Sequence, residues 1–349
     1  MLKFSAHEYP YPSQRQSVFA RRGMVAASQP LAAQAGIEIM QKGGNAIDAA
    51  IATAAALTVV EPTGCGIGGD AFALVWSQGQ LHGLNGNGHA PAALSIEAVK
   101  AAGHGQMPLY GWTPVTVPGC PSAWAELSQR FGKLPFAELL QPAISLARGG
   151  FALSPVVAHQ WQAALDEFTP HRDPVLQAWF ETFLIDGRAP RAGEVFCNPA
   201  QARTLEELAA TRCESLYRGA LAERLDAHSR ASGGYLRSAD LKDYRAQWVE
   251  PIHVNYRGVD VWEIPPSGQG LVALMALKLL EGFRFDHRDS QQTWHRQLEA
   301  MKLAYSDGLH YITDPAHMRV AVADLLSDDY SDRRRAQIGE QAQPPTPGD

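Results

Sequence analysis

The stretch from Glu61 to Asp70 carries the most distinctive residues of the chain, with Cys65 set among closely spaced glycines. Glycine at this density allows a backbone to adopt positive φ and to approach a ligand or a neighbour closely. The dinucleotide fingerprint G-x-G-x-x-G is satisfied by Gly64, Gly66 and Gly69. That fingerprint needs a strand before the glycines and a helix after them. The sequence predicts the reverse order, so a tight helix-to-strand connection is the simpler interpretation and nucleotide binding is a distant alternative.

A nucleophilic cysteine is the other chemistry that this loop could offer. No helix is expected to begin directly after Cys65, so no helix N-terminus lowers the pKa of its thiol. The other cysteines show neither C-x-x-C nor zinc-site spacing; they are Cys120, Cys197 and Cys213. The chain has no G-x-S-x-G elbow, and its twelve histidines show neither H-x-x-x-H nor H-E-x-x-H spacing. The sequence therefore contains no complete catalytic set, and it predicts no metal site and no cofactor.

A second polar stretch, Asn85–Pro91, follows the predicted strand 81–84. This strand and the strand 71–76 are separated by a Gln-Gly turn, so the two are expected to pair as a hairpin. Loops at strand ends often carry binding groups. Asn87 and His89 are the side chains of interest there, and an ordinary polar turn is the alternative interpretation.

Two consecutive helices are expected before the glycine loop. The first begins near Gln29, has Pro30 at an early position and ends at Gly43. Asn45 is the expected N-cap of the second helix, 46–60, which is apolar on most faces and is therefore predicted to be buried. A short strand is expected over 23–28.

One acidic residue, Asp48, lies in the first turn of the helix 46–60. The positive end of the helix dipole favours an acid there. We therefore expect a structural role for Asp48, with a functional role as the less favoured alternative.

The C-terminal third is predicted to contain an apolar helix over 271–280 and a long helix over 291–311. Ser267 or Gly268, just before the first of these, could present N–H groups to an anion, although capping is the simpler use. Residues 1–22 are expected to form an extended arm. The last residues, 341–349, are rich in proline and are expected to be extended and not packed.

Bulk composition is that of an ordinary globular protein, with 349 residues, 46% hydrophobic residues and a net charge of −6. No basic run suggests nucleic acid, and no apolar run reaches the length of a membrane span. The first residues lack the apolar core of a secretory signal, and the cysteines lack a disulfide pattern. A cytoplasmic location is therefore expected, without a nucleic-acid or membrane partner.

Several short motifs occur in an order that resembles the large subunit of gamma-glutamyltransferases (gamma-glutamyltranspeptidases). The three main motifs are 23–32 (GMVAASQPLA), 43–50 (GGNAIDAA) and 61–69 (EPTGCGIGG). Shorter agreements follow in the same order: 90–91, 117–119, 143–147, 233–234, 265–268, 299–307 and 314–315. The resemblance extends over about residues 23 to 330. Each motif alone is weak, whereas the ordered set is highly specific.

The resemblance implies an α/β (α+β) fold, the four-layer αββα sandwich of N-terminal-nucleophile hydrolases. Residues 23–340 would be the helix-rich large-subunit part of one domain that is shared with a small subunit. A precursor of this family cleaves itself before a threonine, which becomes the nucleophile. That cleavage is expected after Asp349, so no catalytic residue is expected in this chain. Thr346 is not a candidate, because it precedes Pro347 and has no free amine. The resemblance implies a heterodimer of one large and one small subunit. Whether two such heterodimers pair with each other stays open.

One departure from the family concerns the segment after the hairpin. Typical members have Asp-x-Arg-Glu-x-Ala-Pro there, and the arginine binds the α-carboxylate of the glutamyl substrate. Asn87 occupies the arginine position, and an amide cannot replace the charge of a guanidinium. His89 is the nearby group that could carry positive charge. Asn87 and His89 are therefore the expected substrate-binding residues.

A second departure is Asp307-Gly308, where the family usually has Asp-Arg. Both departures are typical of a divergent branch with cephalosporin (glutaryl-type) acylases as relatives. We expect an acyltransferase or hydrolase that cleaves gamma-glutamyl or glutaryl-type amides through an acyl-enzyme, with hydrolysis favoured over transpeptidation. The alternative is a family member that never matures and acts as a binding or structural protein.

Overall fold

The computed structural model describes residues 17–171 and 175–349, which form a mixed helical and sheet structure. Residues 17–249 are called the N-terminal region here, and 250–349 the C-terminal region. The helices of the first are α1 (Pro30–Gln41), α2 (Ala46–Val60), α3 (Ile96–Ala101), α4 (Cys120–Phe131), α5 (Phe136–Leu139), α6 (Gln141–Gly149), α7 (Pro155–Phe168), α8 (Gln177–Phe183), α9 (Pro199–Thr211), α10 (Glu214–Arg218), α11 (Ala220–Ala231) and α12 (Ser238–Lys242). Those of the second are α13 (Gly270–Glu281), α14 (Gln291–Tyr311), α15 (Val322–Leu325) and α16 (Asp328–Arg335).

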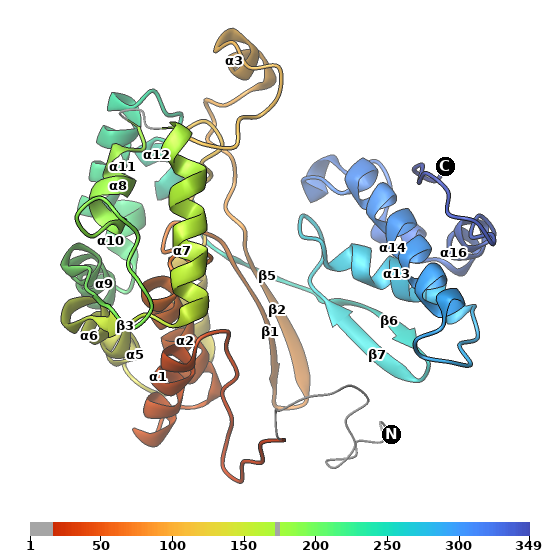
Figure 1. The fold of residues 1–349 in the computed structure, drawn as a ribbon, viewed down its shortest axis with the longest axis horizontal. Helices are drawn as coiled ribbons and strands as arrows, with labels where there is room; N and C mark the ends of the chain where they lie inside the picture. Colours follow the sequence, from red (N-terminus) through yellow and green to blue (C-terminus); the bar gives the residue numbers. More distant parts are fainter. Residues whose placement is uncertain (1–16, 172–174) are drawn as a thin grey trace.

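Three antiparallel sheets accompany these helices. Their strands are β1 (Ala71–Ser77), β2 (Gln80–Gly86), β3 (Phe151–Ala152), β4 (Val195–Phe196), β5 (Gln247–Val249), β6 (Ile252–Tyr256) and β7 (Val259–Glu263). The order in the largest sheet is β1-β2-β5, while β3 pairs with β4 and β6 with β7. Figure 1 shows most N-terminal helices on one side of the β1–β2 hairpin and the C-terminal region on the other.

The first two helices form as the sequence predicts. Gln29 caps α1, and its side-chain oxygen accepts the N–H groups of residues 31 and 32. Asn45 caps α2 in a capping box with Asp48. The Asp48 carboxylate is fully buried and also accepts the backbone N–H groups of Lys133 and Leu134, at 3.1 and 3.3 Å. The structural interpretation of Asp48 is therefore correct, because the carboxylate joins α2 to the loop after α4.

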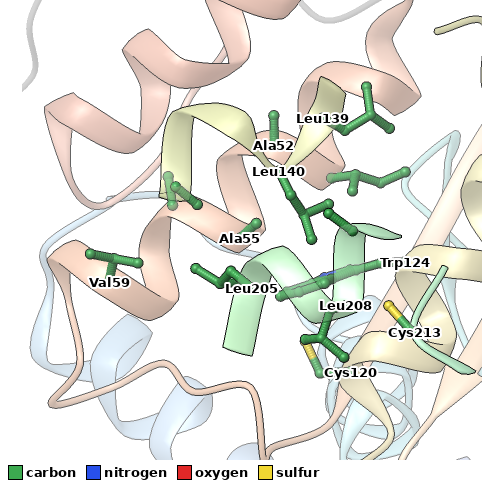
Figure 2. Packing of buried hydrophobic residues seen from close by; sticks show 14 of the residues in the cluster. Ala52, Ala55, Val59, Cys120, Trp124, Leu139, Leu140, Leu205, Leu208 and Cys213 are labelled. Atoms are coloured by element: carbon green, nitrogen blue, oxygen red, sulfur yellow. The ribbon is translucent and has the colours of Figure 1, made fainter. Parts of the chain in front are cut away.

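The main core lies where α2 meets the helices around it. Figure 2 shows Ala52, Ala55 and Val59 of α2 facing Leu140, Leu205 and Trp124. The small side chains of α2 allow close helix packing. At Gly36 of α1, an added methyl group would lie 3.0 Å from the carbonyl oxygen of Ala49. Because α2 is packed on most sides, it provides a fixed base for the glycine loop and the β1–β2 hairpin that follow it.

The C-terminal region has two small apolar clusters, both built on α13 and α14. Gly308 of α14 lies against Val272 of α13, where an added methyl group would come within 2.5 Å of the valine side chain. An arginine at position 308 would not fit this contact. The departure noted in the sequence at Gly308 therefore has a packing reason.

Two expectations for extended segments are wrong. Residues 23–28 form no strand, because no strand in the described part of the chain pairs with them, and they are mostly exposed. The tail 341–349 is extended as expected, but it is packed at its end, where Gly348 is buried. The expected arm 1–22 lies largely outside the described residues; of its residues, 17–22 form neither helix nor strand.

Candidate active site

The end of β2 positions the candidate site. β2 pairs with β1 over its whole length and with β5 near its end, where Asn85 lies opposite Gln247. The chain then turns through Gly88, which has a φ of +72°. A methyl group added at Gly88 would lie 1.9 Å from the carbonyl oxygen of Val117. A side chain could not be placed there, so glycine is required. The hydroxyl of Tyr244 accepts the N–H of Gly88 at 3.1 Å, which fixes the loop against the segment before β5.

Asn87 joins the two regions of the chain. Its amide nitrogen donates a hydrogen bond of 2.6 Å to the hydroxyl of Ser267, in the turn before α13. Its backbone N–H donates to the side chain of Asn85 at 3.0 Å. One N–H of the Asn87 amide is thus used within the protein, out of the two donors and one acceptor oxygen that an amide offers. Ser267 neither caps α13 nor begins it, contrary to the capping interpretation of the sequence.

His89 lies two residues further along the same loop and is exposed. Its ring packs beside that of Tyr244, with ring centroids 5.4 Å apart, and its carbonyl oxygen accepts the N–H of Val117. Burial is the main cause that raises the pKa of Tyr244, and the negative charge of Asp70 also raises it. The phenol therefore stays protonated near neutral pH.

A pocket of about 420 Å³ collects these groups at the end of β2. The loop 85–90 forms one wall, the segment before β5 forms another, and the C-terminal region closes it. The lining residues are Asn85, Asn87, Gly88, His89, Ala90, Asp243, Tyr244, Arg245, Gln247, Ser267, Asp314 and Pro315. Both predicted substrate-binding residues, Asn87 and His89, therefore line one pocket. Such a concave site with converging polar groups is the usual form of a small-molecule site.

Arg245 is the group in this pocket that the sequence did not reveal. Its side chain is 63% exposed, and its contact with a carboxylate is a long one, 4.0 Å to Glu126. Asp243 and Asp314 add negative charge to the same walls. Asp243, Arg245 and Asp314 lie far from Asn87 in the sequence. The pairing of β5 with β2 is what brings Asp243 and Arg245 close to it. No local motif could have identified them.

The glycine loop 61–70 does not behave as its composition suggests. None of Gly64, Gly66, Gly68 and Gly69 has positive φ, and an added methyl group at any of them would meet nothing closer than 3.4 Å. The expectation of close backbone approach is wrong there. The carbonyl of Gly69 instead accepts the N–H groups of Gly119 and Cys120, both at 3.0 Å, at the start of α4. The loop thereby anchors the beginning of β1.

Cys65 borders a second pocket of about 550 Å³, but its environment does not activate it. Burial and the nearby Glu61 carboxylate raise the pKa of the Cys65 thiol, so it is protonated near neutral pH. No histidine lines this pocket. A cysteine–histidine nucleophile at this position is not supported.

The end of the chain, with the expected cleavage position at Asp349, is held against α14 and α16. The N–H of Gly348 donates to Asp307 at 2.8 Å, and Arg334 donates to the carbonyl of Thr346 at 2.7 Å. Asp349 itself is exposed. Over residues 17–171 and 175–349 there is no group of three metal-ligating side chains and no helix long and apolar enough to cross a membrane.

The model of the Gamma-glutamyltranspeptidase family matches residues 32–349. The chain belongs to this family. Among curated relatives, the "Glutathione hydrolase-like YwrD proenzyme" of Bacillus subtilis (strain 168) is 32% identical over 336 residues. The match covers 94% of this chain and 62% of that protein, so the chain spans less than two thirds of the relative's length.

Solved structures of the family agree with this assignment. A cephalosporin acylase from Bacillus halodurans has a TM-score of 0.95 at 56% identity, over 100% of this chain and 65% of that chain. The gamma-glutamyltranspeptidase of Helicobacter pylori has a TM-score of 0.87 at 26% identity, over 95% of this chain and 97% of that chain. The family resemblance and the fold class expected from the sequence are both confirmed.

Proposed function

We propose that this chain is the large-subunit part of an autoprocessed amide hydrolase and acyltransferase. The pocket at the end of β2 carries the proposal. It offers groups that can bind an acyl chain, but it contains no nucleophile hydrogen-bonded to a base. Besides the tyrosine, the pocket has one hydroxyl group that could act as a nucleophile, that of Ser267. This hydroxyl accepts a hydrogen bond from the amide of Asn87. We therefore propose that the attacking group comes from outside the described residues.

That group is proposed to be a threonine that follows Asp349 and becomes N-terminal after cleavage. Its freed α-amino group has an unperturbed pKa near 8, so it can take the proton of its own hydroxyl. The hydroxyl oxygen then attacks the amide carbonyl carbon, the amine leaves with a proton, and an ester remains on the threonine. Water attacks this ester, releasing the acid and restoring the hydroxyl; an amine in place of water gives a new amide.

The extents of the structural matches support cleavage near Asp349. The matched chain of the Bacillus halodurans acylase is longer, since only 65% of it is covered, whereas 97% of the Helicobacter pylori chain is covered. Chains of this family therefore occur in two lengths, and the shorter has nearly the extent of this one. A single cleavage near the proposed position would explain both.

Exposed apolar faces on both regions support a second polypeptide segment. On β1, the side chains of Phe72, Leu74 and Trp76 alternate with buried or half-buried ones and remain 40 to 71% exposed. On α14 an exposed stripe follows helical spacing: Trp294, Leu298, Met301, Tyr305 and Leu309. We propose that residues after Asp349 cover these faces, because apolar patches on soluble proteins usually mark contacts.

Two groups of the pocket support an acyl group that carries a carboxylate, even though Asp243 and Asp314 lie in the same walls. Asn87 carries no charge, so the guanidinium of Arg245 is the cation of this pocket that can bind an anion, and the ring of His89 can donate a hydrogen bond to it. Asn87 lacks the charge of the arginine that typical family members have at this position, which weakens glutamyl binding and favours hydrolysis. We therefore propose glutaryl-type or gamma-glutamyl amides as substrates, with hydrolysis favoured over transfer.

The test uses the full-length protein, with the segment that follows Asp349. Two chains on a denaturing gel are expected, the second beginning with threonine by N-terminal sequencing. A protein that stays in one piece and hydrolyses no amide contradicts the proposal and favours the non-maturing binding protein. Fractionation of cells would test the expected cytoplasmic location.

Substrate choice is tested on the matured enzyme with a glutaryl anilide and a gamma-glutamyl anilide, with and without an amine acceptor. Arg245→Gln should raise KM for the glutaryl anilide about tenfold, because one charge-assisted contact is lost. Arg148→Gln is the matched control, since Arg148 pairs with Glu206 and does not line the pocket. A clear preference for the gamma-glutamyl anilide would contradict the interpretation of Asn87.

A further inference from the structure

A buried ion pair lies at the centre of the C-terminal region. Arg334 of α16 contacts Asp307 of α14 in a two-pronged arrangement, with Nε to Oδ2 at 3.0 Å and Nη2 to Oδ1 at 2.9 Å. The two side chains are 3% and 2% exposed. Such a pair is costly to bury unless its remaining hydrogen-bonding capacity is also satisfied.

The tail provides the missing partners through its backbone. The N–H of Gly348 donates to Oδ1 of Asp307 at 2.8 Å, and Nη2 of Arg334 donates to the carbonyl of Thr346 at 2.7 Å. The hydroxyl of Tyr311 donates to the carbonyl of Gly348. The Asp307–Arg334 pair therefore binds the carbonyl of Thr346 and the N–H of Gly348, one on each side of Pro347. The proline restricts the backbone between these two groups.

Gly348 fits a space that admits no side chain. An added methyl group would lie 2.4 Å from the hydroxyl oxygen of Tyr330 and 2.8 Å from Cδ of Arg334. The Tyr330 hydroxyl is buried. This contact is therefore specific to glycine, whereas Gly339, just before the tail, has nothing within 4 Å.

We infer that Asp307 and Arg334 are positioning residues for self-cleavage after Asp349, and that Gly348 is the residue they require. This inference rests on the proposed function. Cleavage adds one water across the peptide bond, leaving a carboxylate on Asp349 and an amine on the next residue. The bond lies within two residues of an anchored N–H, so its carbonyl is held within about 7 Å of a fixed point. Anchoring reduces the conformations that the reacting groups must otherwise search.

The experiment follows cleavage of the freshly translated full-length precursor by intact mass over time, with the unfolding temperature measured alongside. Gly348→Ala should slow cleavage on the order of tenfold or more, because a misplaced reacting group loses rate steeply. Gly339→Ala is the matched control and should be cleaved like the wild type. Adding Tyr330→Phe to Gly348→Ala removes the nearest atom that the new methyl group meets, while Cδ of Arg334 remains, and should restore part of the rate.

The outcomes separate this inference from the proposed function. A wild-type precursor that is never cleaved defeats the proposed function itself. If the wild type is cleaved and Gly348→Ala is cleaved equally fast, only the inference is overturned. Slow cleavage with a lowered unfolding temperature, or slow cleavage that Tyr330→Phe does not relieve, would assign Gly348 a structural role and overturn it as well.

Discussion

The two regions of the molecule are stabilised by different means. The N-terminal region has one large buried apolar cluster that runs from α1 and α2 through α4, α6, α9 and α11. The C-terminal region has two small apolar clusters and, between α14 and α16, the buried Asp307–Arg334 pair. Its longest helix also leaves an apolar stripe exposed. The first region is thus held by one continuous apolar core, whereas the second combines small apolar clusters with a buried ion pair.

Breaking the buried ion pair should have the largest effect. Arg334→Met leaves the Asp307 carboxylate buried without its counter-ion, which costs about 3–5 kcal/mol. Urea unfolding of the chain measures this loss. The double variant Asp307→Leu/Arg334→Met should recover most of it, since two apolar side chains leave no buried charge. A loss below about 1 kcal/mol for Arg334→Met would show that the C-terminal region does not depend on the pair.

Opening a cavity in the N-terminal cluster should have the next largest effect. Leu205→Ala removes a fully buried side chain of α9, and such truncations cost about 2–5 kcal/mol. Leu109→Ala is the control, because Leu109 is 82% exposed and surface changes stay within about 0.5 kcal/mol. Equal losses at the two leucines, measured by urea unfolding, would contradict the single continuous core.

A charge on the α14 stripe should matter only when the rest of the protein is present. Leu309→Lys replaces a side chain that is 86% exposed here. In the chain that ends at Asp349 it should change stability by less than about 0.5 kcal/mol. In the full-length protein it should cost about 2 kcal/mol or more, because apolar burial is lost. Leu109→Lys, at a similarly exposed leucine, should be silent in both; if Leu309→Lys is silent too, nothing covers the stripe.

A half-buried ion pair of the N-terminal region should show the smallest effect. The hydrogen bond from Arg188, followed by the N–H of Arg191, lowers the pKa of Glu194 from its ordinary 4.5 to about 2. A depressed carboxylate pKa stabilises the fold above about pH 4.5, and this contribution disappears as the pH falls towards 2. Wild type and Glu194→Gln should therefore differ slightly at pH 6 and converge near pH 2 in thermal unfolding. A difference that grows at low pH would contradict this assignment.

Local signals in the sequence predicted much of the fold. Gln29, Pro30 and Asn45 mark helix starts by mechanisms that act within a few residues, and the bounds of α2 and α14 follow from them and from apolar patterning. The hairpin was equally predictable, because its turn residues separate two short apolar runs. The family resemblance rested on ordered motifs and required no knowledge of contacts.

The remaining features depend on contacts between distant residues. Arg245 could not be assigned to the pocket, because its place depends on how β5 pairs with β2. The large apolar side chains of the stripe on α14 stay exposed, and the helix buries Ala300, Leu303 and Ala304 instead. The tail was expected to be unpacked from its prolines, while its packing depends on two backbone groups that composition does not describe.

The outer strand β1 has a practical consequence for handling the chain. β1 lies at one end of the β1-β2-β5 sheet, so no strand of the described chain pairs with its other edge. That edge carries Trp76 at 71% exposure, with Phe72 and Leu74 on the same face. Unprotected, apolar edge strands are templates for strand-to-strand aggregation. A recombinant fragment that ends at Asp349 should therefore precipitate or form β-rich assemblies more readily than the full-length protein, and co-expression with the following segment is the suitable remedy.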